Sequence, residues 1–341
     1  MSQANLQIKN PKLLGVVKFH VILENLTGLL ISTGRQLGRI GGADTSNITI
    51  EKKYECPCPG SEGSGLSQTT SITATVPYIP GSSIKGRMRS LLELAKGLEL
   101  FSTDGKIWMH ALSPNVLKSL AKDDRLGYKE FLDKLKNNND VLIFNKLFGM
   151  NSLHILDFIK ELNEELKNKF KGEDKDKVTN DAIDLFNKLS PTTLLVSDFF
   201  PSCDYVCRIY SINGIVTLAD FLEEKNENRI DRITSAADPR TIERVKPHVE
   251  FEGDLTLLVF NNSKNHLKQY IELISEGLSL IENTYLGASG SRGYGRVKTK
   301  KINVSIVYPA SEKVGEYSGI DELRKNIDQL KDSLLTKLLP K

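Results

Sequence analysis

The sequence predicts an α+β protein whose core elements follow the order strand, helix, strand, strand, helix, strand. Segments 15–26, 249–260 and 297–307 alternate apolar and polar residues, which is typical of strands that bury one face. Segments 84–95 and 265–283 repeat apolar residues at the spacing of a helix, and the short apolar segment 194–199 supplies a further strand. When the polar segment 98–190 is left out, this is the pattern of a modified ferredoxin-like or RRM core.

Composition sets limits on possible partners. The 341 residues suffice for one large domain or two ordinary ones, and 46 basic against 43 acidic residues give a net charge of only +3. Affinity for nucleic acid therefore has to come from local clusters of cations. We find no apolar segment before a cleavage site and no run of about 20 apolar residues, so we expect a cytoplasmic protein without a membrane partner.

The first half of the chain holds one strand followed by glycine-rich stretches. Thr27 and Gly28 end the strand at 15–26, and the segment 32–46 contains four glycines and almost no packing residues, so it must be a loop. The segment 51–76 is also poor in apolar residues, and we expect it to be mobile in isolation.

The first helix has a clear start and end. Pro80 and Gly81 turn the chain, Ser82 or Ser83 is placed to cap the helix, and Gly97 ends it.

Three cations, Lys85, Arg87 and Arg89, follow within the first turns of this helix. Lys85 and Arg89 lie four residues apart, on a different face from the apolar stripe. Cations beside the free N–H groups of a helix N-terminus form a phosphate site by simple electrostatics. The alternative is a solvated basic face, which is what most charged runs are.

The segment 98–190 is rich in Lys, Asn, Asp, Glu and Leu and predicts a helical insertion. Helical spacing is clearest at Ile155, Ile159, Leu162, Leu166 and Phe170.

A glycine-rich loop, Leu286 to Val297, lies between the second helix and the last strand. Its glycines allow close approach to a polyanion, and its arginines neutralise charge. Mononucleotide and dinucleotide folds need the order strand, loop, helix, so a nucleic-acid backbone fits this loop better. The alternative is a tight structural connection. The candidate RNA-binding residues here are Gly290, Ser291, Arg292, Gly293, Tyr294 and Arg296.

The chain has four cysteines, Cys56, Cys58, Cys203 and Cys207, which are too sparse for a disulfide framework in a protein of this length. Together they fit a four-thiolate zinc site, although the spacing differs from the usual one. The alternative is free or occasionally oxidised thiols.

Familiar catalytic motifs are absent, which leaves Asp44 as the candidate catalytic residue. Between Asn25 and Ala43 the only charged residues are Arg35 and Arg39. An acid on a loop lined with cations can hold a divalent ion against a phosphodiester or orient a ribose 2′-OH for attack. A lone loop aspartate is also a common turn or cap residue.

Several segments together are similar to one family. They are Leu26-Thr-Gly-Leu29, Ile40-Gly-Gly-Ala-Asp44, Tyr78-Ile-Pro-Gly-Ser-Ser-Ile-Lys-Gly-Arg-Met-Arg89, Leu147-Phe-Gly149, Glu227-Asn-Arg-Ile-Asp-Arg-Ile-Thr234, Pro239-Arg-Thr-Ile-Glu-Arg244 and the glycine-rich loop. In this order they resemble the repeated backbone subunit of type III-A CRISPR effector complexes, the Csm branch of the RAMP superfamily.

The resemblance implies an RRM-like core stacked as a filament along a CRISPR RNA, with target RNA paired to that guide. It implies that Asp44 cuts target RNA with a divalent metal, Mg²⁺ being the first choice, and leaves a 2′,3′-cyclic phosphate and a 5′-hydroxyl. It also implies a thumb hairpin that flips nucleotides, in which Arg232 and Arg240 contact RNA. The implied partners are CRISPR RNA, target RNA, further copies of the chain, the large polymerase-like subunit, the small subunit and the capping RAMP subunits.

The resulting division of the chain has four parts. They are a first half of the core at 1–97 with a glycine-rich lid loop at 27–80, the helical insertion at 98–190, a second half of the core at 191–310 with a thumb at about 203–247 and the glycine-rich loop at 286–297, and a helical tail at 311–341.

Two alternatives remain open. The first is a backbone paralogue that only coats RNA. The second is a standalone CRISPR-RNA processing endoribonuclease, which needs a general base such as His20 or His248.

Overall fold

The structure, a computed structural model, describes residues 11–32, 45–58, 68–98, 139–149 and 191–338, together with the single residues 100, 106, 108, 110, 180 and 184. The strands are β1 (Leu13–Asn25), β2 (Thr49–Cys58), β3 (Gln68–Pro77), β4 (Leu194–Val196), β5 (Phe200–Pro201), β6 (Leu222–Ile230), β7 (Ala237–Val245), β8 (Glu250–Phe260), β9 (Val297–Tyr308) and β10 (Glu312–Tyr317). The α-helices are α1 (Gly81–Ala95), α4 (Asn139–Phe148), α7 (Cys203–Asn213), α8 (Leu267–Asn283), α9 (Ile320–Lys325) and α10 (Ile327–Leu338).

The main sheet confirms the predicted α+β core. Its strands lie in the order β10, β9, β1, β8, β4, with β5 also paired to β8, and all of these pairings are antiparallel. If β1, β4, β8 and β9 are numbered as the first to fourth core strands, their order across the sheet is fourth, first, third, second. Two interleaved strand–helix–strand units produce this order, as the ferredoxin-like pattern requires.

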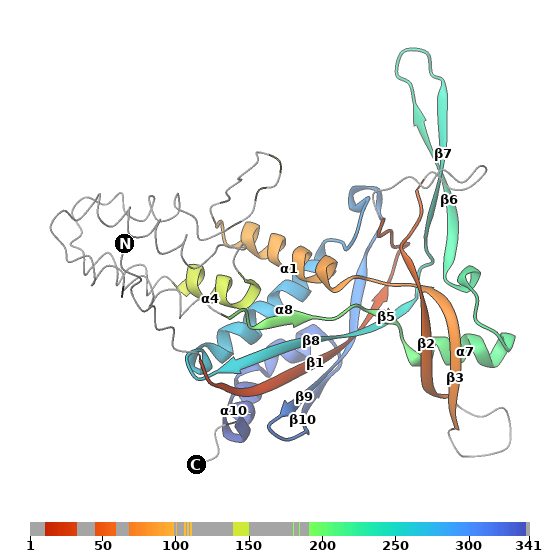
Figure 1. Cartoon of the computed structure of the whole chain (residues 1–341). Helices are drawn as coiled ribbons and strands as arrows, with labels where there is room; N and C mark the ends of the chain where they lie inside the picture. The colour runs from red at the N-terminus through yellow and green to blue at the C-terminus, as the bar shows by residue number, and fades with distance from the viewer. Residues whose placement is uncertain are drawn as a thin grey trace, which may run out of the picture.

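The central strand β1 has one buried face. Val17, Phe19, Val21 and Leu23 are buried, while the residues between them are half-buried, because side chains alternate along a strand. Helices α1 and α8 contact each other and contribute to the same core (Figure 1). This packing leaves the other face of the sheet for polar residues.

Strands β2 and β3 form a two-stranded hairpin, so the expectation of a mobile segment at 51–76 is wrong where the structure describes it. The register runs from Thr49 opposite Pro77 to Cys58 opposite Gln68. The hairpin lies beside α7 (Figure 1). Its low apolar content misled us because only alternate residues, such as Tyr54 and Cys56, need to be buried.

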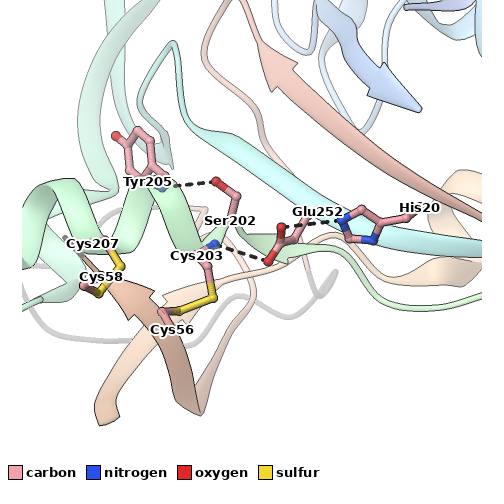
Figure 2. Close-up of a disulfide and its surroundings, with 8 residues drawn as sticks. All are labelled: His20, Cys56, Cys58, Ser202, Cys203, Tyr205, Cys207 and Glu252. Carbon is pink, nitrogen blue, oxygen red and sulfur yellow. Dashed lines mark hydrogen bonds and ion pairs between the residues drawn. A yellow bond between two sulfur atoms is a disulfide. The ribbon is translucent and has the colours of Figure 1, made fainter. Parts of the chain in front are cut away.

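Two disulfides join this hairpin to α7, Cys56–Cys203 and Cys58–Cys207 (Figure 2). Residues two apart on a strand are separated by about 6.6 Å. Residues four apart on a helix are separated by about 6 Å along its axis. The two spacings match, so the strand and the helix can be bridged at two successive positions.

The four cysteines therefore meet as predicted, but the predicted zinc site is wrong. Each sulfur is bonded to another sulfur, whereas zinc binds thiolates. Among the described residues no group of His, Cys, Asp and Glu side chains is placed to hold a metal ion. The expectation that the cysteines are too sparse for a disulfide framework is also wrong, because two bonds suffice to fasten one hairpin to one helix, and of the alternatives the structure shows oxidised thiols.

The other predicted segments differ in detail. The range 203–247 expected for the thumb contains α7 as well as a hairpin, β6–β7, and the tail expected to be helical begins with β10 before α9 and α10. Of the insertion at 98–190, the structure describes chiefly α4, and the helical repeat at 155–170 lies outside the described residues. No helix in the described ranges is long and apolar enough to cross a membrane.

We expect the contributions of the two disulfides to be non-additive, because either bond alone still closes a loop of nearly the same length. A double substitution, Cys58→Ser with Cys207→Ser, should cost little, because the remaining bond still closes a loop with a sequence separation of 147. Replacing all four cysteines should lower the free energy of unfolding by up to about 5 kcal/mol, the entropy of closing such a loop. Urea unfolding measures both values. Stoichiometric zinc, or thiols that react without reductant, would contradict the disulfide assignment.

Candidate nucleic-acid interface

The interface is built where β1 ends. The side-chain amide of Asn25 donates to the carbonyl oxygens of Thr27 (2.9 Å) and Lys246 (2.7 Å), and its oxygen accepts from the backbone N–H of Val249 (2.9 Å). Asn25 is buried, so these bonds are not exposed to competition from water. They tie the segment after β1 to the end of β7 and the start of β8.

The glycine-rich loop is hydrogen-bonded to the segment that follows Asn25. The N–H of Gly295 donates to Gly28 (2.9 Å), that of Leu26 to Arg296 (2.7 Å), and that of Ala288 to Leu30 (2.8 Å). The loop is therefore a fixed structure rather than a free tether.

Two glycines in this loop are required by the backbone. Gly295 has φ of 72°, and a Cβ there would lie 1.9 Å from the carbonyl oxygen of Leu286, so no other residue fits. Gly293 has φ of 83° but faces open space. Gly290 begins a short 3-10 turn that continues through Ser291 to Arg292.

The polar side chains of the loop divide into exposed and buried ones. The side chain of Arg292 is 53% exposed, and Ser291 and Arg296 are exposed as well. Arg296 has no ion-pair partner among the residues that the structure describes. Tyr294 is 0% exposed, so its predicted role as an RNA-binding residue is wrong in this structure.

The thumb hairpin, β6–β7, projects from the body of the protein (Figure 1). Its register sets opposite charges against each other, Glu223 against Arg244, Glu227 against Arg240 and Arg229 against Asp238. Each of these pairs also forms an ion pair, with N–O distances of 2.7–2.8 Å. Such cross-strand pairs stabilise a hairpin that has little other support.

The tip of the hairpin is a hydrogen-bonded turn that exposes an apolar side chain. The carboxylate of Asp231 accepts from the N–H groups of Ile233 (3.0 Å) and Thr234 (2.7 Å), which fixes the turn. Ile233 is 93% exposed, and Arg232 beside it is exposed without an ion-pair partner among the described residues. Exposed isoleucines on a rigid turn are suited to contact with bases or apolar surface.

The start of α1 differs from the predicted cap. The N-cap is Pro80, and neither Ser82, which is exposed, nor Ser83, which is half-buried, forms a capping hydrogen bond. Instead the carboxylate of Asp198 accepts from the N–H of Gly81 at 2.8 Å. A carboxylate at a helix N-terminus satisfies the same dipole that a phosphate would. The predicted anion site thus already has a resident anion.

The cations of α1 have internal partners, so the prediction that they bind phosphate is corrected. Arg89, with its side chain 14% exposed, pairs with the buried Glu93 at 2.8 Å and donates to the carbonyl oxygen of Gly149 at 3.0 Å. Lys85 donates to the carbonyl oxygen of Leu194 at 2.8 Å, and burial, with the nearby charge of Arg89, lowers its pKa.

Arg87 has a similar internal role. Its guanidinium lies 4.0 Å from the centre of the Tyr285 ring and donates to the carbonyl oxygen of Tyr285 at 3.0 Å. All three cations therefore hold α1 against neighbouring segments instead of facing solvent freely.

Arg35, Arg39 and Asp44 lie outside the described residues. The two ends of their segment are tied together, because the N–H of Ile48 donates to the carbonyl oxygen of Ile31 at 2.9 Å. Thr45, which follows Asp44 in the chain, accepts from the N–H of Glu243 on β7 at 2.9 Å. The chain therefore re-enters the described structure at the base of the thumb hairpin.

The two histidines considered as general bases are held by carboxylates. His20 lies between Asp254 (2.9 Å) and Glu252 (3.6 Å), and these hydrogen bonds raise its pKa to about 9. It is protonated at neutral pH and cannot accept a proton. His248 pairs with Glu24 at 2.7 Å. Figure 2 shows His20 and Glu252 beside the disulfides.

The open face of the main sheet does not resemble an RRM platform. RRM domains bind bases with aromatic side chains on this face. Here the central strands place Lys18, His20 and Asp254 on it, joined to each other by ion pairs. The exposed cations of the glycine-rich loop and the thumb hairpin are better placed to bind a phosphate backbone.

Sequence reasoning missed Glu227 and Asp198. Glu227 was detectable, because folding the chain about the turn at 231–236 sets its charge against Arg240. Asp198 was not detectable, because its partner, Gly81, is 117 residues away in the chain.

Comparison with known families adds to this geometry. Residues 23–298 match the model of the RAMP superfamily. The chain belongs to the RAMP superfamily. This match spans most of the sequence, including the end of β1, α1, the thumb hairpin and the glycine-rich loop.

Several relatives of this chain are named as the CRISPR system Cms endoribonuclease Csm3. The protein from Methanothermobacter thermautotrophicus is 28% identical over 240 residues, which cover 67% of this chain and 69% of that protein. The protein from Streptococcus thermophilus is 41% identical over 88 residues, 26% of this chain and 40% of that protein. The latter alignment thus spans less than half of the relative.

Solved structures show further similarity. The crystal structure of Methanopyrus kandleri Csm3 aligns with a TM-score of 0.46 at 17% identity, covering 93% of this chain and 97% of that one. A Csm3–Csm4 subcomplex of a type III-A CRISPR-Cas interference complex aligns with a TM-score of 0.40 at 17% identity, with the same coverage.

We expect His20→Gln to flatten the pH dependence of stability. Hydrogen bonds to Asp254 and Glu252 raise the pKa of His20 from 6.5 to about 9, so the folded protein keeps a proton that the unfolded chain loses. This stabilisation is complete below pH 6.5 and is lost as the pH rises towards 9. Urea unfolding across that range measures it. An identical decline in the variant would show that His20 is not responsible.

We expect Arg89→Ala to destabilise the protein strongly. The substitution leaves the buried carboxylate of Glu93 without its partner, which costs about 3–5 kcal/mol. Arg296→Ala is the control, because an exposed residue without such a partner should change stability by no more than about 0.5 kcal/mol. Thermal and urea unfolding provide the comparison. Equal stability of the two variants would return Arg89 to the list of candidate RNA-binding residues.

Proposed function

We propose that this protein is a CRISPR-RNA-binding backbone subunit of a type III RNA-targeting complex, and that it cuts guide-paired target RNA at regular intervals. The observation that carries the binding part is the convergence of the glycine-rich loop and the base of the thumb hairpin, where Arg292 and Arg240 lie near one carboxylate, Glu227. Membership of the RAMP superfamily and the names of the Csm3 relatives support the assignment.

The interface is suited to RNA of any sequence. Its exposed groups are guanidinium groups on fixed backbone, which contact phosphates and carry no sequence information. A subunit that must accept every guide needs this property, because base pairing with the target supplies the specificity. The thumb hairpin, with Ile233 at its tip, would separate one nucleotide from its neighbours.

The cutting step rests on Asp44. A nucleotide displaced by the thumb hairpin has an unstacked phosphodiester, and its 2′-OH can then attack the adjacent phosphorus in line, with the 5′-oxygen as leaving group. Positioning would supply most of the rate, and the products would be a 2′,3′-cyclic phosphate and a 5′-hydroxyl. The hydrogen bond from the N–H of Glu243 to the carbonyl oxygen of Thr45 supports a position of Asp44 close to the hairpin, because it attaches the next residue in the chain to β7.

We propose Mg²⁺ as the cofactor of this step. Asp44 would be the residue that holds the ion, because its carboxylate is a hard oxygen ligand of the kind that Mg²⁺ binds together with substrate phosphates. The ion would neutralise charge that develops on the phosphate.

The partners follow from the same proposal. They are CRISPR RNA, target RNA, further copies of this chain in a filament, the large polymerase-like subunit, the small subunit and the capping RAMP subunits. We propose a cytoplasmic location, where such RNA is present.

The alternative of a purely structural paralogue shares the same interface and differs only in the role of Asp44. The alternative of a standalone processing enzyme loses one of its two candidate general bases, because His20 is held in its protonated form, and it then rests on His248, which pairs with Glu24.

Asp44→Ala tests the catalytic part. In complexes assembled with guide RNA, we expect cleavage of target RNA to be lost while guide binding is unchanged. Asp332→Ala, on the exposed surface of α10, is the control and should leave both unchanged. Chelation should stop the wild-type reaction and Mg²⁺ should restore it. Undiminished cutting by the Asp44→Ala complex would support the structural paralogue instead, and cutting in chelator would refute the metal requirement.

Arg292→Ala and Arg296→Ala test the binding part. Each should weaken affinity for single-stranded RNA about equally for all sequences and reduce the slope of log affinity against log salt by about 1, because one phosphate contact is removed. Lys313→Ala on β10 is the control and should have no effect. Losses that depend on RNA sequence would exclude a phosphate role.

A further inference from the structure

Tyr294 is buried in a loop whose polar side chains Ser291, Arg292 and Arg296 are exposed. Its side chain forms a small apolar cluster with Leu30 and Ile242, separate from the main core. The Nζ atom of Lys225 lies 4.5 Å from the ring centre, and the guanidinium carbon of Arg244 lies 4.8 Å from it. A ring in contact with two cations and with an apolar cluster is strongly oriented.

The hydroxyl group of Tyr294 is equally constrained. It donates to one oxygen of Glu227 at 2.6 Å, while the other oxygen accepts from Arg240 at 2.8 Å. These hydrogen bonds lower the pKa of Glu227, and burial with the nearby carboxylate raises that of Tyr294 to about 12. The proton therefore stays on the tyrosine and the charge stays on the glutamate.

Glu227 also joins cations from two separate parts of the fold. Lys225 on β6 lies 3.7 Å from its carboxylate, and Arg292 in the glycine-rich loop lies 3.8 Å from it. Together with Arg240, three cations surround one anion, so the site keeps an excess of positive charge. Such an excess on partly exposed side chains favours a further anion.

The thumb hairpin depends on support at this point. Its lower end is bonded to Leu29 through Val245, with N–O distances of 2.8 and 3.1 Å. Residues 228–239 are exposed. Tyr294 meets the hairpin between these two regions, opposite the paired residues Lys225 and Ile242. It is therefore placed to brace the hairpin partway along its length.

We propose that Tyr294 and Glu227 form a latch that holds the thumb hairpin at a fixed angle to the glycine-rich loop, so that Arg240 and Arg292 meet one RNA backbone together. Tyr294 is then a positioning residue and makes no contact with RNA. The effect on RNA rests on the proposed function. The latch itself does not, because it is a contact between two parts of this chain.

Tyr294→Phe tests the latch with minimal change, since only the hydroxyl group is removed. Hydrogen exchange of backbone amides at 225–227 and 240–242 should become about tenfold faster, the effect of losing one hydrogen bond to a charged group. Amides of β1 and β8 should exchange as in the wild type, which shows that the fold is intact.

The same variant tests the consequence for RNA. Affinity for a fluorescent single-stranded RNA of mixed sequence should fall several-fold, while the salt slope stays unchanged because no cation has been removed. If Tyr294 had only a structural role, the affinity for RNA would not change in a variant whose fold is intact. Tyr285→Phe is the matched control, because the contacts that the structure gives to Tyr285 involve its ring and backbone rather than its hydroxyl group.

The possible outcomes test separately whether the latch exists and whether it matters for RNA binding. Wild-type exchange in the Tyr294→Phe variant overturns the latch. Faster exchange with unchanged RNA affinity overturns its role in positioning. Loss of affinity in Tyr285→Phe as well would also overturn it, because any lost hydroxyl would then suffice. If wild-type protein in its complex fails to bind RNA, the proposed function fails, and the exchange measurement still decides whether the latch exists.

Discussion

The buried amide of Asn25 is the interaction on which the candidate interface depends. β1 is paired along its length with β8 and β9, so its end is one of the most firmly held points of the fold. From that point Asn25 bonds to the carbonyl oxygens of Thr27 and Lys246 and to the N–H of Val249. The glycine-rich loop and the thumb hairpin are both attached to the segment that this residue fixes. The main sheet therefore holds the candidate interface in a fixed position.

The cations of this protein fall into two groups, those with partners inside the protein and those exposed to solvent. Arg89 and Lys85 are bound to carbonyl oxygens and to Glu93, and they stabilise the contacts of α1. Arg296 and Arg232 are exposed, and they are the cations that an RNA backbone can reach at low cost. Burial, rather than the presence of a basic residue, decides which group a cation joins, because a buried charge must be paired inside the protein.

The anions complete this arrangement. Asp198 occupies the N-terminus of α1, and Glu227 holds cations of the loop and the hairpin together. Both positions lie where a phosphate was expected from helix and charge arguments. Carboxylates of the chain thus stabilise local concentrations of positive charge that would otherwise repel each other before RNA arrives.

The sequence by itself determined the core, because alternation in β1, β8 and β9 and the helical spacing in α1 and α8 are local patterns that burial imposes. It also located the glycine-rich loop, and the family resemblance placed a hairpin within residues 203–247. Tertiary structure alone decided that Tyr294 is buried, that Arg89 is internal and that the four cysteines are paired as disulfides. Each of these depends on a partner distant in the chain, and only folding decides which distant groups become neighbours.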